Sequence, residues 1–278
     1  MQRFNPQPLL MLLLFVAAGF VIIGSGPMFV PMAGTFDRHE AAIWKVIGTA
    51  LMFALTWWFV RRDPFARTML DLGLTGRNVR VLLGWTLVAA AMIFGWLLLF
   101  RGLQPFHIEA GTMTATGFAF SVVVYLFGSI IEELAFRGYP FLRMRRAYGV
   151  VASVAITSLA FGLFHFPGMH GLALLKVVAT AGLCSVIFCL GFLRTGTLWA
   201  AIALHAGLNI TLHSILGAGD ANRASLLRVV ADGPVPVWDV WFWSFMAAGS
   251  VTAILLALGL RKTPGDDGAS RDTISGKK

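Results

Sequence analysis

The sequence predicts an all-α membrane protein, built as a polytopic bundle of about eight transmembrane helices. Hydrophobic residues make up 58% of the chain and charged residues only 13%, whereas a soluble domain carries about 25% charged residues. The apolar residues are also gathered into long runs that recur from end to end. Lipid is therefore the expected solvent for most of the protein.

Eight apolar runs are candidate spans, and several approach the roughly 20 residues that a spanning helix needs. They cover residues 9–23, 43–60, 79–100, 117–136, 150–166, 172–193, 197–216 and 237–260. Arg3 and the first run also fit a secretory signal peptide, but no small-x-small cleavage site follows before Pro27, so a retained helix is expected. Residues 1–262 are expected to form one transmembrane domain, and residues 263–278 a flexible cytoplasmic tail.

The placement of basic residues predicts an orientation, because Lys and Arg collect in cytoplasmic loops. With the N-terminus inside, 16 of the 22 basic residues fall in cytoplasmic segments and six on the outer side. Both termini are therefore expected in the cytoplasm, and the compact chain favours a prokaryotic cytoplasmic membrane. Topology and contact with the lipid bilayer explain the net charge of +9, so no nucleic-acid partner is expected.

Two carboxylates and a guanidinium end the fourth apolar run, where ionisable groups are expensive and indicate function. On a helix, Glu133 and Arg137 form an i,i+4 pair on one face, whereas Glu132 projects about 140° away from Arg137. A buried structural ion pair accounts for Glu133 and Arg137 but leaves Glu132 without a local counter-ion. Glu132 is therefore the candidate general base.

Two more polar groups interrupt apolar helices. His165 follows Phe161 at the end of the fifth run, and His205 and Asn209 share one face of the seventh run. A lone histidine at such a place is more often a hydrogen-bonded core residue, but the pairing of an imidazole with a carboxamide is harder to explain in that way. Glu132 and His165 lie at nearly equal distances from Gly149, so antiparallel helices joined near residues 140–149 would bring them to one level.

These residues resemble the CAAX prenyl protease and bacteriocin-processing family, also called Abi or CPBP, of intramembrane endopeptidases. Its motifs EExxxR, FxxxH and HxxxN occur here in order, beginning at Glu132, Phe161 and His205, within a core of about residues 117–216. Asp71-Leu72-Gly73-Leu74 is also similar to a short acidic-Leu-Gly-Leu element of the family.

The resemblance implies hydrolysis of a peptide bond at an intramembrane site. Glu132 and His165 would activate a water molecule, and His205 and Asn209 would stabilise the oxyanion, with support from Glu133, Arg137 and Phe161. The family's usual classification as metalloproteases favours a divalent metal such as zinc, with Glu132, His165 and His205 as the candidate ligands. No HExxH motif is present, and Glu132 cannot easily be both ligand and base, so the sequence leaves metal dependence open.

Other uses of intramembrane polar groups stay open as alternatives. A proton-coupled transporter can also gather Glu, Arg and His inside a bundle, although matched halves or broken helices are not evident. A catalytically silent scaffold or immunity protein is a third interpretation. For a protease, the expected partner is a membrane-associated peptide or protein substrate, and the sequence does not select among prenylated CAAX-type tails, leader peptides and other peptides.

Overall fold

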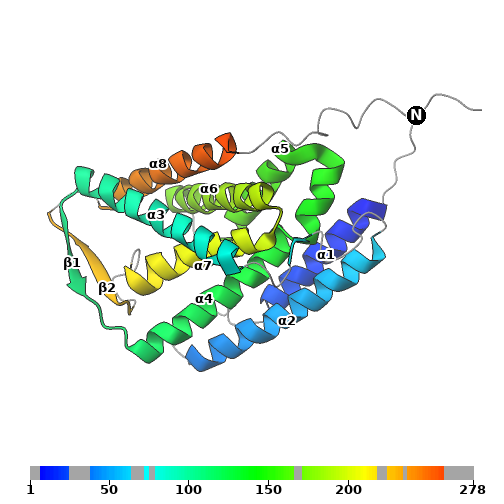
Figure 1. The fold of residues 1–278 in the computed structure, drawn as a ribbon, viewed down its shortest axis with the longest axis horizontal. Helices are drawn as coiled ribbons and strands as arrows, with labels where there is room; N and C mark the ends of the chain where they lie inside the picture. Colours follow the sequence, from blue (N-terminus) through cyan, green and yellow to red (C-terminus); the bar gives the residue numbers. More distant parts are fainter. Residues whose placement is uncertain are drawn as a thin grey trace, which may run out of the picture.

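The structure, a computed structural model, describes residues 7–24, 38–63, 72–74, 79–165, 171–217, 224–233 and 237–259. Within these residues, eight α-helices pack into a bundle and two short strands close one end of it (Figure 1). The elements are α1 (Gln7–Gly24), α2 (Arg38–Arg62), α3 (Val79–Leu103), β1 (Phe106–Ala110), α4 (Ala115–Phe136), α5 (Tyr139–Phe164), α6 (Gly171–Thr195), α7 (Leu198–Asn209), the π-helix η2 (Ile210–Ile215), β2 (Leu227–Ala231) and α8 (Val237–Leu258). The predicted helical bundle is confirmed, and the predicted tail, residues 263–278, lies outside the described residues.

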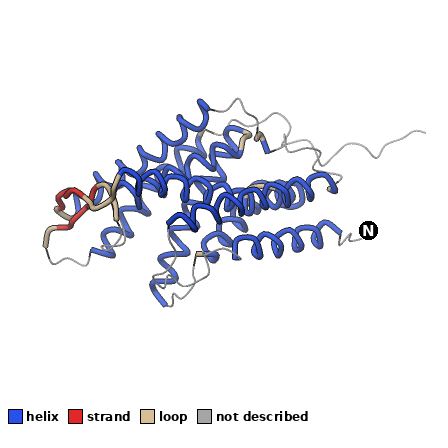
Figure 2. Tube along the Cα trace, turned by 90° about the horizontal axis from the view of Figure 1, so that it is seen from below, coloured by secondary structure: helices blue, strands red, loops and turns tan. Residues whose placement is uncertain are grey.

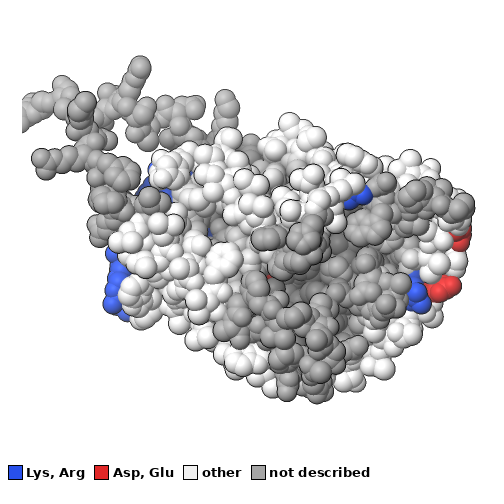
Figure 3. All heavy atoms as spheres, turned by 180° about the vertical axis from the view of Figure 1, so that it is seen from behind, with Lys and Arg blue, Asp and Glu red and all other residues white. Residues whose placement is uncertain are grey.

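Most of the helices meet the requirements for crossing a membrane. In the described part of the chain, six helical segments are long and apolar enough, and one of these, Ala115–Phe164, contains both α4 and α5. The apolar part of α1, Leu10–Ile23, is shorter. On the face shown in Figure 3, the described surface is mostly uncharged, and charged atoms gather mainly towards its two ends. The protein is thus an integral membrane protein.

Helix α7 lies at the centre of the bundle, where it contacts α3, α4 and α6 (Figure 1). It is rich in alanine, and every residue from 200 to 208 is buried. Small residues let neighbouring backbones approach closely in membranes. At Gly207, for example, an added Cβ would lie only 3.0 Å from the Cβ of Ala89 on α3. The helix that carries His205 is therefore surrounded by protein.

The start of α7 is fixed by a contact with residues 72–74. Thr197 caps the helix by accepting a hydrogen bond from the N–H of Trp199 at 3.3 Å, and its hydroxyl donates to the Gly73 carbonyl at 2.8 Å. Gly73 has a φ of +63°, and a Cβ there would collide with the Gly196 carbonyl oxygen. Leu72 is fully buried, while Asp71 lies outside the described residues. The Leu-Gly part of the short acidic element thus positions the helix of the HxxxN motif.

Helix α5 differs from the sequence prediction. Residues 140–148, expected to belong to a turn, are helical: α5 begins at Tyr139 with Pro140 in its first turn, where proline is well tolerated. The chain reverses in two steps, at Arg137–Gly138 and again at Gly149, which has a φ of 79° and a ψ of 175°. Glycine permits this backbone conformation, and it divides α5 into two parts.

The two strands are a second difference from the all-α prediction. Strands β1 and β2 pair antiparallel, with Phe106 opposite Ala231 and Glu109 opposite Arg228. They lie at the end of the molecule away from the N-terminus (Figure 2). Each strand has only five residues, and α4 to α7 separate them in the sequence, so no hairpin turn signals their pairing.

Candidate active site

The last two turns of α4 carry the predicted carboxylates into the bundle. Glu132 is only 6% exposed and Glu133 is completely buried. At its other end α4 begins with Thr114, whose hydroxyl oxygen accepts the N–H of Gly117 at 3.1 Å. Along its length α4 contacts α2, α5 and α7. Both carboxylates therefore sit on a helix that is anchored at its start and packed on several sides.

Glu133 and Arg137 form the pair that their spacing predicts. Arg137 Nη1 lies 3.0 Å from Glu133 Oε1, and both side chains are fully buried. The other terminal nitrogen of Arg137 donates to the hydroxyl of Ser185 on α6. Its guanidinium also lies 4.3 Å from the ring centroid of Phe161 and 5.3 Å from that of Phe188. Because aromatic faces stabilise cations, α4, α5 and α6 together hold this charge.

His205 on α7 is bound to the same carboxylate. Its Nδ1 lies 2.9 Å from Glu133 Oε1 and donates the hydrogen bond, because a carboxylate only accepts. The imidazole stacks on Phe188 at 4.8 Å between centroids, and it meets Phe161 in a T-shaped arrangement with 5.6 Å between centroids. The ring is thereby fixed, with Nε2 directed away from Glu133.

His165, at the end of α5, is oriented in a similar way. Its Nδ1 donates to the Phe161 carbonyl at 2.8 Å, which leaves Nε2 unprotonated in the neutral ring. The Phe161 ring centroid lies 4.6 Å from the centroid of His165. Phe161 therefore contacts Arg137 and both histidines, which gives the aromatic residue of the FxxxH motif a physical role.

The two histidines meet at Glu132. Glu132 Oε2 lies 3.9 Å from His165 Nε2 and 3.8 Å from His205 Nε2. These separations are too long for direct hydrogen bonds. Oε2 is buried and accepts no hydrogen bond from the described residues. One carboxylate oxygen and two ring nitrogens thus lie close together, where a water molecule can donate to two of them.

Asn209 is the fourth predicted catalytic residue. It is the last residue of α7, one turn beyond His205, and its side chain is half-buried. Among the described residues its carboxamide makes no hydrogen bond, and the π-helix η2 begins immediately after it. Single π-helical turns are frequent at functional sites. The structure brings Glu132, His165 and His205 together, and it places Asn209 one turn after His205 on α7.

The candidate metal ligands suit zinc in type but not in spacing. Among the described residues, no group of three or more His, Cys, Asp or Glu side chains is arranged to hold a metal ion. Bonds of about 2.0 to 2.1 Å in a tetrahedral site would put ligand atoms about 3.4 Å apart. The separations of 3.8 and 3.9 Å from Glu132 Oε2 exceed that value. His170, near the end of α5 in sequence, lies outside the described residues.

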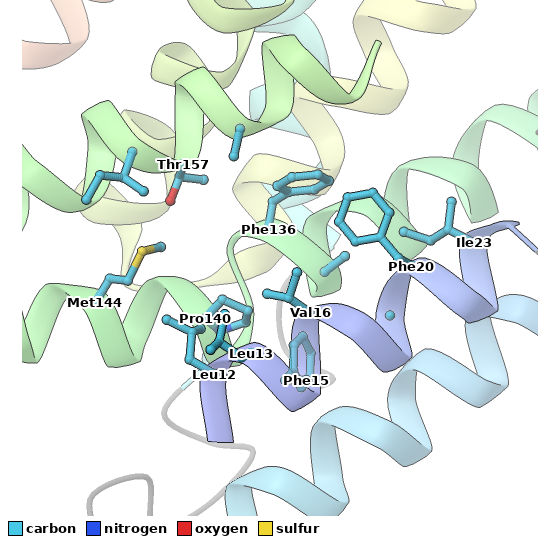
Figure 4. Close-up of a pocket in the computed structure, with 14 residues that line it drawn as sticks. Leu12, Leu13, Phe15, Val16, Phe20, Ile23, Phe136, Pro140, Met144 and Thr157 are labelled. Carbon is cyan, nitrogen blue, oxygen red and sulfur yellow. The ribbon is translucent and has the colours of Figure 1, made fainter. Parts of the chain in front are cut away.

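An apolar cavity of about 220 Å³ lies beside the site (Figure 4). Helix α1 forms one wall of it, and α4 and α5 form the others. Phe136, on the last turn of α4, lines the cavity and also contacts Phe161, with 5.1 Å between ring centroids. Thr157 lines it from α5, one turn before Phe161. The cavity is thus close to the residues that orient the histidines.

Two residues of the site were not predicted from the sequence. On α6, the Ser185 hydroxyl accepts a hydrogen bond from Arg137. Phe188 contacts the Arg137 guanidinium and stacks on His205. They are three residues apart and share a helix face, but a serine and a phenylalanine in an apolar helix carry no distinguishing signal. Only the packing of α6 against α5 and α7 identifies them.

Comparison with known proteins agrees with the motifs. Residues 114–211 match the family described as Type II CAAX prenyl endopeptidase Rce1-like. The comparison with curated proteins gave no match. The matched segment runs from the N-cap of α4 into η2, so it contains the described carboxylate and histidine cluster together with Arg137 and Asn209. Residues 114–211 are therefore similar to the Rce1-like family of type II CAAX prenyl endopeptidases, the family to which the three motifs point.

Proposed function

We propose that the protein is an intramembrane endopeptidase in which Glu132 activates a water molecule for attack on a peptide bond. The observation that carries this proposal is the approach of His165 Nε2 and His205 Nε2 to Glu132 Oε2, at 3.9 and 3.8 Å. A water molecule at this point would donate to Glu132 Oε2 and His165 Nε2, and could transfer a proton to Glu132 as it attacks.

The remaining residues have roles that follow from their partners. In its doubly protonated form, His205 keeps its bond to Glu133 through Nδ1 and donates from Nε2 towards the reacting centre. The carboxamide of Asn209, one turn away, supplies a further donor for the oxyanion. Arg137 holds Glu133 and so keeps His205 in place. Water adds across the scissile bond, and the proton that Glu132 takes from the water passes to the amine as the C–N bond breaks.

Substitution of Glu132 tests the reaction. In detergent-solubilised protein assayed with a fluorescence-quenched farnesylated CAAX-type peptide, Glu132→Gln should lower kcat by at least about 10²-fold, because the general base is lost. Glu109→Gln is the matched control, since Glu109 is exposed on β1, away from the site. Wild-type turnover by Glu132→Gln would contradict the proposal. A wild type that cleaves no peptide would favour a transporter or a silent scaffold.

We further propose that the substrate is a prenylated peptide and that the cavity between α1, α4 and α5 receives its lipid chain. The cavity wall is almost entirely apolar, and Phe136 connects it to the catalytic cluster. An apolar pocket favours an apolar chain, at about 0.8 kcal/mol for each buried CH₂.

Filling the cavity tests this assignment. Ala160→Phe places a ring in the cavity wall and should raise KM for a prenylated peptide without changing KM for its unprenylated counterpart. Ala155→Phe is the control, because Ala155 is exposed on the same helix but does not line the cavity. Equal effects of both variants would show that the cavity is not the lipid-chain site.

A further inference from the structure

Lys45 is a basic residue inside a candidate membrane span, Ala42–Arg62, and its side chain is only partly exposed. It points across the interface between α2 and α4. Its Cδ, Cε and Nζ atoms lie 3.8, 3.6 and 3.5 Å from the position that a Cβ on Gly128 would take. These are van der Waals distances, so the lysine side chain packs directly against this part of α4.

The neighbouring contacts hold α2 and α4 in this register. One turn after Lys45, the hydroxyl of Thr49 donates to the Phe127 carbonyl at 3.2 Å. An added Cβ at Gly48 would lie 3.1 Å from Cδ1 of Ile131. The position of Lys45 relative to the catalytic helix is thus set by close helix packing.

The Lys45 ammonium lies near Glu132 without pairing with it. Gly128 and Glu132 are one turn apart on the same face of α4, and the charges of Lys45 and Glu132 interact electrostatically. The ion pairs of Glu132 within 4 Å in the described part of the chain are with His165 and His205. A cation inside a membrane is costly unless an anion accompanies it. The site therefore has a positive group one turn from its general base, and that group can take a second anion.

The distance from Glu132 limits which anion this can be. The four residues from Gly128 to Glu132 rise about 6 Å along α4. An extended peptide advances about 3.3 to 3.6 Å per residue. With a hydrogen-bond length added at the ammonium, an anion at Lys45 lies about two or three residues from a peptide bond that is held at Glu132.

We propose that the Lys45 ammonium binds the free C-terminal carboxylate of the peptide fragment that cleavage releases. Lys45 would then set the distance between the scissile bond and the C-terminus of the substrate. This inference rests on the proposed endopeptidase function and names the part of the substrate that the Gly128 end of the site recognises. The other source of a carboxylate, an Asp or Glu side chain near the same position, is distinguished below.

The test compares two fluorescence-quenched farnesylated peptides that differ only in ending with a free acid or an amide. A charge-assisted hydrogen bond contributes about 1.5 to 3 kcal/mol, so the wild type should prefer the acid by about 10- to 100-fold in kcat/KM. Lys45→Met should reduce this ratio to about one, and Lys45→Arg should restore most of it. Lys176→Met is the matched control and should keep the wild-type ratio, because Lys176 lies on α6 near Phe242.

Three results would overturn the proposal. The first is equal cleavage of acid and amide by the wild type, and the second is a Lys45→Met variant that slows both peptides alike, which would mean that Lys45 acts only on Glu132. The third is recovery of the full acid rate by an amide peptide whose last residue is Asp, which would assign Lys45 to side-chain carboxylates.

Failure of the proposed function can be separated from failure of this inference. If the wild type cleaves neither peptide, the endopeptidase proposal fails, and binding of the labelled peptides to Glu132→Gln protein decides the role of Lys45. Fluorescence polarisation should then show at least tenfold tighter binding of the acid, and this preference should disappear in the variant that also carries Lys45→Met. Equal binding of acid and amide would contradict the inference.

Discussion

At the scale of single residues, the site depends on two adjacent glutamates with different partners. A helix turns by about 100° per residue, so Glu132 and Glu133 cannot face the same neighbours. Glu133 pairs with Arg137 at 3.0 Å and with His205 at 2.9 Å, so its role is to hold these two side chains in place. Glu132 Oε2 accepts nothing from the described residues and faces two imidazoles. The i,i+4 spacing of Glu133 and Arg137 makes this division predictable from the sequence.

Removing the buried guanidinium should be costly. Arg137→Gln leaves the Glu133 carboxylate without its cation, and breaking a buried ion pair typically costs about 3 to 5 kcal/mol. We expect a lower thermal unfolding temperature in detergent and a parallel loss of activity, because His205 loses its fixed partner. Arg145→Gln, an exposed arginine on α5, should behave as the wild type. An unchanged unfolding temperature in Arg137→Gln would mean that the pair contributes no net stability.

The spacing of the donor atoms gives an expectation for metal dependence. Because Glu132 Oε2 is 3.8 and 3.9 Å from the two ring nitrogens, farther than in a zinc site, we expect peptide hydrolysis to continue in the presence of a chelator at constant pH. Metal analysis of the purified protein should find less than one equivalent of zinc. Loss of activity on chelation, restored by added Zn²⁺ and absent in His165→Ala, would instead establish the metalloprotease interpretation.

At the scale of elements, hydropathy predicted the helices better than it predicted the helix ends and the turns between helices. The runs at 79–100 and 172–193 match α3 and α6 to within a few residues, because a span needs a fixed length of apolar chain. The start of α5 at Tyr139 and the π-helix after Asn209 were missed. Both depend on the hydrogen bonds and contacts that neighbouring helices offer to the backbone. These contacts cannot be read from residue composition.

The sheet at the end of the bundle should depend on pH through His107. Its imidazole bonds to Glu109 at 3.0 Å and to Asp232 at 2.7 Å, and these two hydrogen bonds raise the pKa of His107 above 6.5. A raised pKa means that the stabilisation is fully present below the unfolded value and is lost as the pH rises through the folded value. The pairing of β1 and β2 should therefore weaken at alkaline pH.

Hydrogen exchange of the strand amides measures this effect. After correction for intrinsic rates, protection of residues 106–110 and 227–231 should be lower at pH 8.5 than at pH 5.5. The double variant Glu109→Gln and Asp232→Asn removes both acceptors and should abolish the difference. Equal protection at the two pH values in the wild type would show that His107 does not support the sheet.

At the scale of the whole molecule, the fold gathers residues that are far apart in the chain. The order of the three motifs predicted that α4, α5 and α7 share a site. The nearly equal distances of Glu132 and His165 from Gly149 pointed to the same meeting, but through a single turn, whereas the chain reverses at Arg137–Gly138 and again at Gly149. The contributions of α2 and α6 could not be predicted in the same way. Lys45 was visible as a lysine in an apolar run, but only the packing of α2 on Gly128 directs it towards Glu132.

The bundle has two chemically different ends (Figures 1 and 3). At the end where α2 finishes, Arg61 and Arg62 lie over Trp57 and Trp58, at 4.6 and 3.9 Å from the ring centroids. Arg194 ends α6 beside the last residues of α8. The opposite end carries the sheet, with acidic residues beside its arginines. Aromatic residues paired with arginines are typical of membrane interfaces.

We propose that the arginine-rich end faces the cytoplasm, because 16 of the 22 basic residues fall on the side of the termini. Reporter fusions after Lys278 and within residues 64–71 should both report the cytoplasm, and a fusion within residues 218–223 should report the far side. A C-terminal reporter found outside would contradict this orientation. In the proposed orientation Lys45 lies deeper in the membrane than Glu132 as seen from the cytoplasm, so a cytoplasmic peptide must enter with its C-terminus first.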